Sequence, residues 1–331
     1  MINTRLFDWY GIDVKKNLQI KTRCSKPFDT VLINKNGSCY LCECTSWLPQ
    51  SVGNLNLQSL DTILQSQTAK ILQDSIIDNS YAFCNNKQCS YLLDNAQLAW
   101  PETAPTKQIK NIRLAIDQSC NLSCPSCRNR LIFDKDKIQL KRKFKIVDKI
   151  IQYISQQSHN ITIHIGSDGD PFASLVYRYF MDQTKNLSNV KFTIQTNGLL
   201  IKKKYERFQY LFKNLNVLNI SVDGATKKTY EKLRRGGSWE KIIENFNFIK
   251  SIKKNFKIYV HMVVQQENWT EMPLMLNFGK KYNVDKIFFN KIQNWNTELD
   301  YSKQTFFQDP KFINLSKTIS LDPLSSVATL L

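Results

Sequence analysis

The sequence predicts an α/β protein made of a partial (β/α)6 TIM-like barrel preceded by a small cysteine-rich α+β domain. Strand-like and helical patterns alternate after residue 108 and give six predicted strands, spaced about thirty to fifty residues apart. Six of the nine cysteines lie in the first hundred residues, whereas the net charge of +18 lies entirely in residues 107–331. A chain of 331 residues is long enough for two such modules.

Residues 1–100 form the predicted cysteine-rich domain. The dipeptide Asn36-Gly37 lies between two short apolar runs and predicts the turn of a β-hairpin, and a helical pattern follows over residues 60–77. The cysteines of this domain are Cys24, Cys39, Cys42, Cys44, Cys84 and Cys89. Their clustering favours metal binding in a reducing compartment over a disulfide framework. Residues 101–108, which contain two prolines, are predicted to be a linker.

Residues 109–295 form the predicted barrel. Its strands are expected at 109–116, 160–165, 190–196, 217–222, 257–264 and 285–289. Its helices are expected at 140–155, 172–186, 199–213, 238–254 and 272–282. In a barrel of this kind, the loops that follow the strands converge on one mouth, where ligands bind. Residues 296–331 match no pattern, and we expect a tail of unknown role.

The loop after the first barrel strand carries Cys120, Cys124 and Cys127, with three and then two residues between them. Thiolates this close together bind soft metals and iron–sulfur clusters. Three cysteines are one fewer than a structural zinc site normally uses. A four-iron cluster held by three thiolates has one iron open to a small ligand. A zinc knuckle or a chance group of cysteines is the alternative.

The phrase CNLSCPSC, placed directly after a predicted strand, resembles the radical S-adenosylmethionine (SAM) superfamily. The resemblance implies that Cys120, Cys124 and Cys127 hold a [4Fe-4S] cluster whose open iron chelates SAM. It also implies reductive cleavage of SAM to methionine and a 5′-deoxyadenosyl radical, which abstracts hydrogen from a substrate. These cysteines are therefore the predicted catalytic and metal-binding residues of the barrel.

The first domain resembles the auxiliary-cluster domain called SPASM, or its shorter twitch form, because Gly37 to Cys42 matches its Gly-x4-Cys element. The resemblance implies a second [4Fe-4S] cluster, whose ligands would be Cys24, Cys42, Cys84 and Cys89. Cys39 and Cys44 are either ordinary buried cysteines or replacements for one of those ligands. In the family the auxiliary domain usually follows the barrel, whereas here it precedes it. A zinc-binding module is the alternative for this region.

Small and polar residues follow the later strands. Gly169-Asp170-Pro171 resembles the Gly-Gly-Glu-Pro motif of the family, with Asp in place of Glu, which implies that it binds the amino group of SAM. Ser221 and Asp223 resemble the Ser-x-Asp-Gly motif of the same cofactor site, which implies that Ser221 contacts the ribose or methionine part of SAM. Without the resemblance, an ordinary Asp-Pro turn would explain the first motif.

Four further residues are candidates at the mouth of the barrel. Arg234 or Arg235 lies where related enzymes place an arginine on the SAM carboxylate, a role that suits a planar and permanently charged group. Each is equally well explained as a solvated cation at a helix end. Asn290 is predicted to face the adenine of SAM. His261, on the fifth strand, is either a proton donor and acceptor or a core residue.

The lysine-rich helices present a basic surface that a nucleic acid could use, but runs of lysine are more often solvated helix faces. No apolar run is long enough to span a membrane, and the first residues do not begin a signal peptide. We therefore expect a cytoplasmic protein with neither a membrane nor a nucleic acid as a partner.

The predicted function is that of a radical SAM enzyme that abstracts hydrogen from an unidentified substrate. By analogy with SPASM and twitch enzymes, a peptide or protein is the first candidate substrate, and a sugar or nucleotide-derived metabolite is the alternative. The expected partners are SAM and an electron donor such as flavodoxin or ferredoxin. A non-catalytic metal-binding module that binds nucleic acid, and a cluster-binding scaffold without turnover, are the remaining alternatives.

Overall fold

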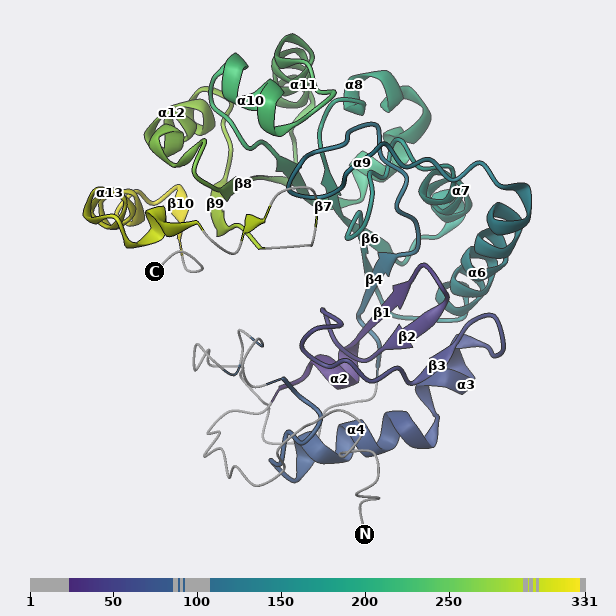
Figure 1. The fold of residues 1–331 in the computed structure, drawn as a ribbon. Coiled ribbons are helices and arrows are strands. Elements are labelled where there is room, and N and C mark those ends of the chain that lie inside the picture. The colour runs from purple at the N-terminus through teal and green to yellow at the C-terminus, as the bar shows by residue number, and fades with distance from the viewer. Residues whose placement is uncertain are drawn as a thin grey trace. The chain divides into compact units, whose positions relative to one another are not determined.

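The computed structural model describes residues 24–85, 89, 92, 108–293, 297, 300–301 and 304–327. The chain divides into two compact units (Figure 1). The first unit holds the described residues up to Asp117, together with Asp136–Ser167 and Asn186–Val190. The second unit holds Gln118–Lys135, Asp168–Lys185 and the described residues from Lys191 onward.

The described strands of the first unit follow the order β5-β4-β1-β2-β3, of which Figure 1 labels β4, β1, β2 and β3. β1 (Thr30–Asn34) pairs in parallel with β4 (Asn111–Ala115), and β4 pairs in parallel with β5 (Ile161–Ile165). β2 (Ser38–Tyr40) and β3 (Gly53–Asn54) then continue the sheet in antiparallel fashion. The cysteine-rich segment therefore contributes a strand directly beside the first predicted barrel strand.

The predicted hairpin turn is present between β1 and β2. Gly37 has a φ of +82°, a conformation that glycine adopts without steric penalty. The helix expected over residues 60–77 is instead two helices, α3 (Leu60–Leu64) and α4 (Gln67–Ile77). The cause is Ser66, whose Oγ accepts a hydrogen bond from the Ala69 amide at 3.2 Å and so begins a new helix.

The apolar core of the first unit lies between its sheet and its helices. α2 (Lys26–Asp29) is short, whereas α6 (Lys137–Ser155) is the long helix after β4, and Asp136 caps it. Alternate residues of β4 are buried, as period-2 patterning requires, whereas four consecutive residues of β1 are buried, which indicates that both faces of that strand are covered. The buried face of α6 supplies Ile146, Val147, Ile150 and Ile154.

The second unit contains a parallel sheet whose described strands follow the order β10-β9-β8-β7-β6 (Figure 1). All four neighbouring pairs are parallel. The strands are β6 (Val190–Thr196), β7 (Leu215–Ser221), β8 (Lys257–Val264), β9 (Lys286–Lys291) and β10 (Ser325–Ser326). The α-helices are α7 (Leu175–Gln183), α8 (Ile201–Lys204), α9 (Gln209–Lys213), α10 (Lys227–Leu233), α11 (Trp239–Ile252), α12 (Met272–Lys281) and α13 (Pro310–Ser320). Short 3-10 turns lie at Thr184–Asn186, Glu206–Phe208, Trp269–Glu271 and Thr305–Gln308.

The fold class predicted from the sequence is confirmed: the protein is α/β with a parallel sheet of the partial-barrel kind and has antiparallel strands in its cysteine-rich region. In β6, β8 and β9, buried residues alternate with residues that are half-buried or exposed. The helix expected over 199–213 is divided into three short helical segments. Part of the predicted tail is ordered, since α13 precedes β10, which pairs with β9 through Ser325 and Ile287.

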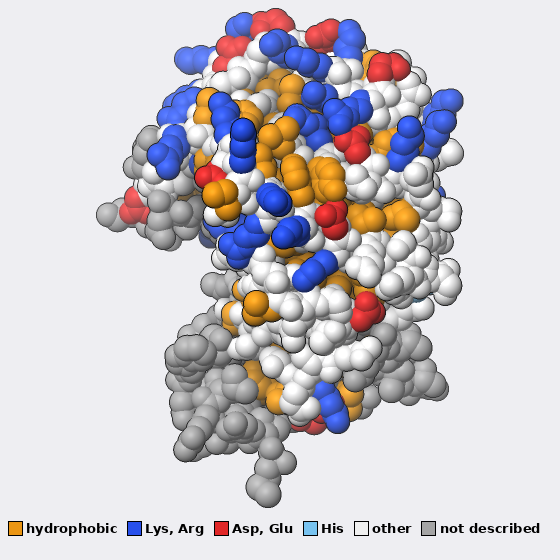
Figure 2. Space-filling model, turned by 90° about the vertical axis from the view of Figure 1, so that its right-hand side faces the viewer, with side chains coloured by type: hydrophobic (Ala, Val, Ile, Leu, Met, Phe, Trp, Pro, Cys, Tyr) orange, Lys and Arg blue, Asp and Glu red, His pale blue; other side chains and the backbone are white. Residues whose placement is uncertain are grey.

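Lys and Arg side chains are spread over one face of the molecule, with apolar side chains exposed between them (Figure 2). Several exposed lysines form ion pairs, such as Lys202 with Glu244 and Lys280 with Asp322. Such pairs are typical of solvated helix faces and contribute little to stability. Within the described residues, no helix is long and apolar enough to cross a membrane.

Candidate active site

The three barrel cysteines lie on one loop of the second unit. The amide of Cys120 donates to the carbonyl oxygen of Ile132 at 2.9 Å and anchors the start of the loop. The amides of Cys127 and Arg128 both donate to the carbonyl oxygen of Cys124, at 2.9 and 3.0 Å. This tight turn brings Cys124 close to Cys127. Cys120 and Cys124 are buried, whereas Cys127 is exposed.

Each of the three sulfur atoms accepts a contact from a side-chain N–H group. Asn197 Nδ2 lies 3.7 Å from Cys120 Sγ, and Arg234 Nη1 lies 3.8 Å from Cys124 Sγ. Both Nε and Nη2 of Arg128 lie 3.4 Å from Cys127 Sγ. Donors and cations of this kind stabilise a thiolate over a thiol.

Burial works against ionisation of the free thiols. It raises the pKa of Cys120 to about 11, with a further increase from Asp170. It also raises the pKa of Cys124, although Arg234 opposes that shift. A thiol that coordinates a metal ion is deprotonated outright, so these high values describe the thiols without metal.

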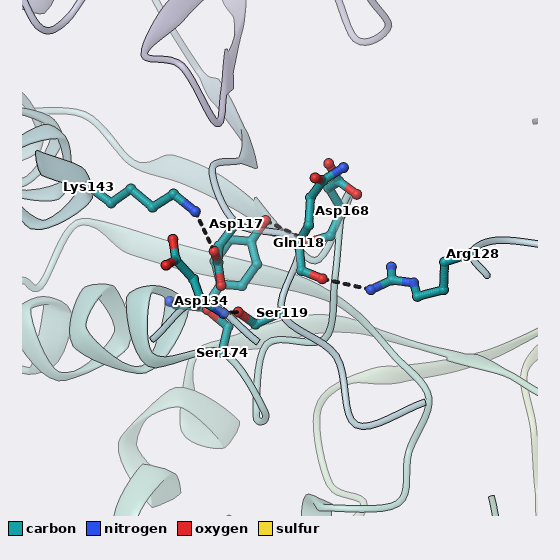
Figure 3. Close-up of polar contacts among 9 residues, drawn as sticks. Asp117, Gln118, Ser119, Arg128, Asp134, Lys143, Asp168 and Ser174 are labelled. Carbon is teal, nitrogen blue, oxygen red and sulfur yellow. Dashed lines mark hydrogen bonds and ion pairs between the residues drawn. The ribbon is translucent and has the colours of Figure 1, made fainter. Parts of the chain in front are cut away.

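Two arginines hold the cysteine loop in shape. Arg128 Nη1 donates to the carbonyl oxygen of Gln118 at 2.6 Å, which ties the end of the loop to its start (Figure 3). Arg235 donates through Nε to the Ser123 carbonyl at 2.9 Å and through Nη2 to the Asn129 carbonyl at 3.1 Å. Arg235 therefore holds the loop through its backbone carbonyl groups. This engagement argues against Arg235 as the arginine that binds a ligand carboxylate.

The base of the loop is fixed by a further contact. The amide of Asp134 donates to Ser119 Oγ at 2.9 Å, so the segment that leaves the loop lies beside the segment that enters it (Figure 3). The carbonyl oxygen of Ser119 also accepts from the amide of Asp170 at 2.9 Å. The Gly169-Asp170-Pro171 motif is thereby attached to the cysteine loop.

Asp170 is a buried carboxylate that four donors surround. Its Oδ2 accepts from Thr196 Oγ1 at 2.7 Å and from the Asn197 amide at 2.9 Å. Its Oδ1 accepts from the amides of Phe172 and Ala173, at 3.0 and 3.2 Å. Burial raises the pKa of Asp170, and these hydrogen bonds oppose that shift. A carboxylate has about four acceptor positions, which these four donors occupy. Asp170 therefore joins the loop of Phe172 and Ala173 to the loop of Thr196 and Asn197. Its predicted contact with SAM stays a prediction.

Asp223 and Arg234 form a buried ion pair beside Cys124. Arg234 Nε lies 2.9 Å from Asp223 Oδ2, and the two side chains are 12% and 2% exposed. Asp223 Oδ1 also accepts from the Val263 amide at 2.9 Å. Burial raises the pKa of Asp223, and Arg234 opposes that shift. The two predicted residues are thus brought together, and Arg234 links Asp223 to the cysteine loop.

The half-buried face of β6 to β9 carries the other predicted residues. Gln195 Nε2 donates to Ser221 Oγ at 2.6 Å. His261 Nε2 lies 3.0 Å from Asn219 Oδ1, and Asn290 Nδ2 lies 3.2 Å from His261 Nδ1. An Nε2–H tautomer satisfies both contacts, because Asn219 Oδ1 can only accept and the Asn290 amide can donate. Asn290 is therefore engaged with His261, and its predicted contact with adenine stays a prediction.

Two polar groups near this site are buried without a hydrogen-bond partner among the described residues. They are the side-chain amide of Gln265, which is 1% exposed, and the hydroxyl of Tyr230. Asn268 ties Gln265 to the site, since its Oδ1 accepts from the backbone N–H of Gln265 at 2.8 Å and its Nδ2 donates to the Asp223 carbonyl at 2.8 Å. A buried polar group without a hydrogen-bond partner destabilises the folded protein. The Gln265 amide and the Tyr230 hydroxyl therefore have hydrogen-bonding capacity for a polar ligand such as SAM.

The four predicted auxiliary ligands all belong to the first unit, and their thiols act on one another electrostatically. Burial raises the pKa of Cys24 to about 12, with smaller contributions from Cys42 and Cys89. Burial also raises the pKa of Cys84, and the thiols of Cys24, Cys42 and Cys89 raise it further. Cys24 and Cys84 pack against the apolar cluster of Phe28, Ile76 and Tyr81.

The ambiguous pair, Cys39 and Cys44, behaves differently. Burial alone raises the pKa of Cys39 to about 12, and its Sγ contacts the carbonyl oxygen of Gly37 at 3.7 Å. Cys44 is half-buried, and its Sγ lies 2.8 Å from Ser46 Oγ. Neither thiol is among the groups that shift the pKa of Cys24, Cys42 or Cys84. Whether Cys39 or Cys44 replaces one of the four stays an open alternative.

In the described part of the chain, no three His, Cys, Asp or Glu side chains converge as they would around a single metal ion. An iron–sulfur cluster is larger, and each thiolate binds a different iron, so its ligands stand farther apart. Both cysteine sets consist of thiols, which are the ligands such clusters use. The donor sets and the unsatisfied amide therefore fit a cluster and SAM.

Arg128 and Asn197 were not among the residues predicted from the sequence. Their positions relative to sulfur depend on the turn after Cys124 and on the contact of two loops. For Arg128, its place directly after Cys127 in the sequence was the signal from which a contact with that thiol could have been predicted.

Comparison with known families and proteins agrees with this geometry. The model of the radical SAM superfamily matches residues 116–279, and that of the SPASM iron-sulfur cluster-binding domain matches residues 24–90. The chain belongs to the radical SAM superfamily. This radical SAM enzyme uses a [4Fe-4S] cluster with SAM, and it carries its SPASM iron–sulfur domain ahead of the barrel, as predicted.

Several curated proteins and solved structures are similar to this radical SAM chain. GTP 3′,8-cyclase of Limosilactobacillus fermentum is 23% identical over 216 residues, which cover 64% of this chain and 62% of the relative. The cysteine-type anaerobic sulfatase-maturating enzyme of Clostridium novyi is 28% identical over 177 residues, which cover 49% of this chain and 46% of the relative. The chain thus spans less than two thirds of the length of these relatives.

Among solved structures, anSMEcpe with bound AdoMet has a TM-score of 0.47 at 17% identity, covering 63% of this chain and 56% of that one. Streptococcus suis SuiB bound to the precursor peptide SuiA has a TM-score of 0.45 at 13% identity, covering 93% of this chain and 73% of that one.

Proposed function

We propose that Cys120, Cys124 and Cys127 hold the SAM-binding [4Fe-4S] cluster and that the enzyme starts radical chemistry on a peptide or protein. The single observation that carries the catalytic part is that every one of these sulfurs has a side-chain N–H donor beside it. When bound, the cluster supplies the electron that cleaves SAM to methionine and a 5′-deoxyadenosyl radical, which removes a hydrogen atom from the substrate.

The residues around the loop bind and orient SAM. Gln265 offers a buried amide with a free donor and a free acceptor, and Tyr230 offers a hydroxyl. Arg234 supplies a cation for the carboxylate of SAM, while Asp223 holds the guanidinium in place at 2.9 Å. Gly169, Asp170 and Pro171 form the loop that would face the amino group of SAM. Ser221, which accepts from Gln195, is the candidate for its ribose or methionine part.

Cys24, Cys42, Cys84 and Cys89 are proposed to hold the auxiliary [4Fe-4S] cluster. Their mutual influence on pKa supports this set, since it places the thiols within electrostatic reach of one another. We expect Cys42→Ser to lower the iron content of the anaerobically reconstituted protein. Cys39→Ser is the matched control, and it should retain iron. Equal iron loss in both variants would contradict the assignment.

The chemistry of the half-buried face of β6 to β9 favours a peptide or protein as the substrate. Gln195, Asn219, Asn290 and His261 present amides and an uncharged imidazole, because burial lowers the pKa of His261 to about 4. Such groups match peptide amides, whereas a triphosphate calls for several cations. The name of the Clostridium novyi relative, a sulfatase-maturating enzyme, also supports a protein substrate.

A nucleotide is the second candidate substrate, because seven similar curated proteins are GTP 3′,8-cyclases. We further propose a one-electron donor such as flavodoxin or ferredoxin as partner. A cytoplasmic location would keep the clusters and free thiols reduced. Membranes and nucleic acids are not among the proposed partners.

The test is 5′-deoxyadenosine formation by anaerobically reconstituted protein given SAM and dithionite. Wild type should form it, and the Cys120→Ala/Cys124→Ala/Cys127→Ala variant should not. Cys44→Ser is the control for cysteine replacement as such. Peptide pools and GTP are then added separately, because a true substrate accelerates SAM cleavage and transfers its hydrogen to 5′-deoxyadenosine. Product from the triple variant at the wild-type rate would refute the proposal.

A further inference from the structure

Arg128 makes a distinctive contact with the outermost thiol of the cysteine loop. Its Nε and Nη2 both lie 3.4 Å from Cys127 Sγ, while its Nη1 is held by the Gln118 carbonyl at 2.6 Å. The guanidinium is therefore oriented by the backbone so that two of its donors face one sulfur (Figure 3 shows the Gln118 contact). A planar fork held at one corner loses little further freedom when its other donors bind.

The charge of Arg128 is less compensated than that of Arg234. Arg234 forms its ion pair with Asp223 at 2.9 Å, so part of its charge is neutralised by contact. Among the residues that the structure describes, no ion pair joins Arg128 to an acidic side chain, although the carboxylate of Asp168 also acts on its charge. Asn197, beside Cys120, is neutral. Of the two arginines whose contacts with these sulfurs are described, Arg128 is thus the one without an ion pair to an acidic side chain.

Positive charge and N–H donors near the sulfurs favour the more negative of two cluster states. Net charge, hydrogen bonds to sulfur and solvent exposure set the reduction potentials of iron–sulfur clusters. Reduction adds one electron, so the reduced state gains more from a neighbouring guanidinium than the oxidised state does. Cys127 is the exposed thiol of the three, and it is the sulfur that Arg128 contacts through two donors.

We infer that Arg128 is a positioning residue that raises the reduction potential of the SAM-binding cluster through its two contacts with Cys127. The inference rests on the proposed function, because it requires the cluster to be held by this loop. None of the described contacts of Arg128 is with the Gly169-Asp170-Pro171 motif or with Asp223, so we expect its effect on the potential to be separable from SAM binding. Electrons come from a low-potential one-electron donor, and each reduction step transfers one electron to the cluster.

The experiment compares the midpoint potential of wild type, Arg128→Met, Arg128→Lys and Arg130→Met after anaerobic reconstitution. Arg130, an exposed arginine on the same loop, is the matched control. The reduced cluster is followed by electron paramagnetic resonance during a titration with dithionite. The signal that changes on addition of SAM belongs to the cluster with an open iron, which distinguishes it from the auxiliary cluster.

Arg128→Met should lower the ratio of reduced to oxidised cluster about tenfold at a fixed solution potential, a shift of about 59 mV for a one-electron couple. Arg128→Lys keeps the charge but loses the fork, so it should shift the potential in the same direction by less. Arg130→Met should match wild type.

Three results would overturn the inference. Equal potentials for Arg128→Met and Arg130→Met would do so, and so would a raised KM for SAM with an unchanged potential, since that would make Arg128 a ligand of SAM. If Arg128→Met loses its iron, an unchanged potential in Arg128→Lys would leave only a scaffolding role. Absence of any SAM-responsive signal in wild type would instead refute the proposed function itself.

Discussion

Removal of the cation beside Asp223 should destabilise the second unit strongly. In Arg234→Met, the Asp223 carboxylate, 2% exposed, keeps the Val263 amide as a donor but loses the guanidinium at 2.9 Å. Loss of one partner from a buried ion pair costs about 3–5 kcal/mol, because the remaining charge is uncompensated. We expect a loss of about 3 kcal/mol near pH 8, since the Val263 hydrogen bond remains.

The loss should depend on pH with a definite sign. Burial already raises the pKa of Asp223 in the wild type, and removal of Arg234 raises it further. A group whose pKa is higher in the folded state binds more protons when folded, so the variant gains stability as the pH falls through that pKa. The slope is at most about 1.4 kcal/mol per pH unit.

A double-mutant cycle with Asp223→Asn tests this account. The double variant should be more stable than Arg234→Met alone, because no buried charge is left unpaired, and the coupling should be about 2 kcal/mol. Denaturant unfolding of the metal-free protein gives the global values, and hydrogen exchange at the Val263 amide reports the local effect. Additive losses, with no pH dependence in Arg234→Met, would show that the two residues are not an energetically coupled pair.

Three other perturbations test the fold. Gly224→Ala places a Cβ 2.4 Å from the Tyr230 backbone nitrogen, so thermal unfolding should show a loss of about 2 kcal/mol or more; unchanged stability would contradict that close approach. Lys143→Met removes the ammonium group that lies 2.6 Å from the buried carboxylate of Asp117 and should cost about 3 kcal/mol in denaturant unfolding, whereas exposed Lys141→Met should cost almost nothing. Burial lowers the pKa of His164 to about 4, so stability should fall by up to about 3 kcal/mol as the pH drops from 6.5 towards 4; His164→Gln should flatten that decline, and an identical decline in the variant would refute it.

Local sequence patterns were sufficient for the barrel strands and for the cysteine loop. Period-2 alternation identifies β8, and the CNLSCPSC spacing identifies the loop with Cys120. Each of these two signals is contained within a few consecutive residues. Within the same loop, Arg128 could not be assigned a role, since its contact with Cys127 depends on a turn and on the Gln118 carbonyl.

Pairing over long sequence distances was not predictable in the same way. β1 carries a short apolar run that fits many sheet edges, and nothing in it specifies β4 as its parallel neighbour. The two-residue strand β10 is too short to produce any periodicity. Likewise, the division between α3 and α4 depends on whether Ser66 caps a helix or lies within one, and both are compatible with the helical pattern.

The parallel pairing of β1 with β4 joins two strands that are synthesised at different times. Thr30 pairs with Asn111, so the first strand leaves the ribosome well before its partner is made. Until then, Val31 and Ile33, which are fully buried in the finished sheet, belong to a strand with an unpaired edge. Conversely, a shortened chain that begins at residue 108 would lack β1. Its strand β4 would then have an open edge and a tendency to aggregate. The cysteine-rich region thus protects the edge of β4 from pairing with other chains, and it also carries the proposed ligands of the auxiliary cluster.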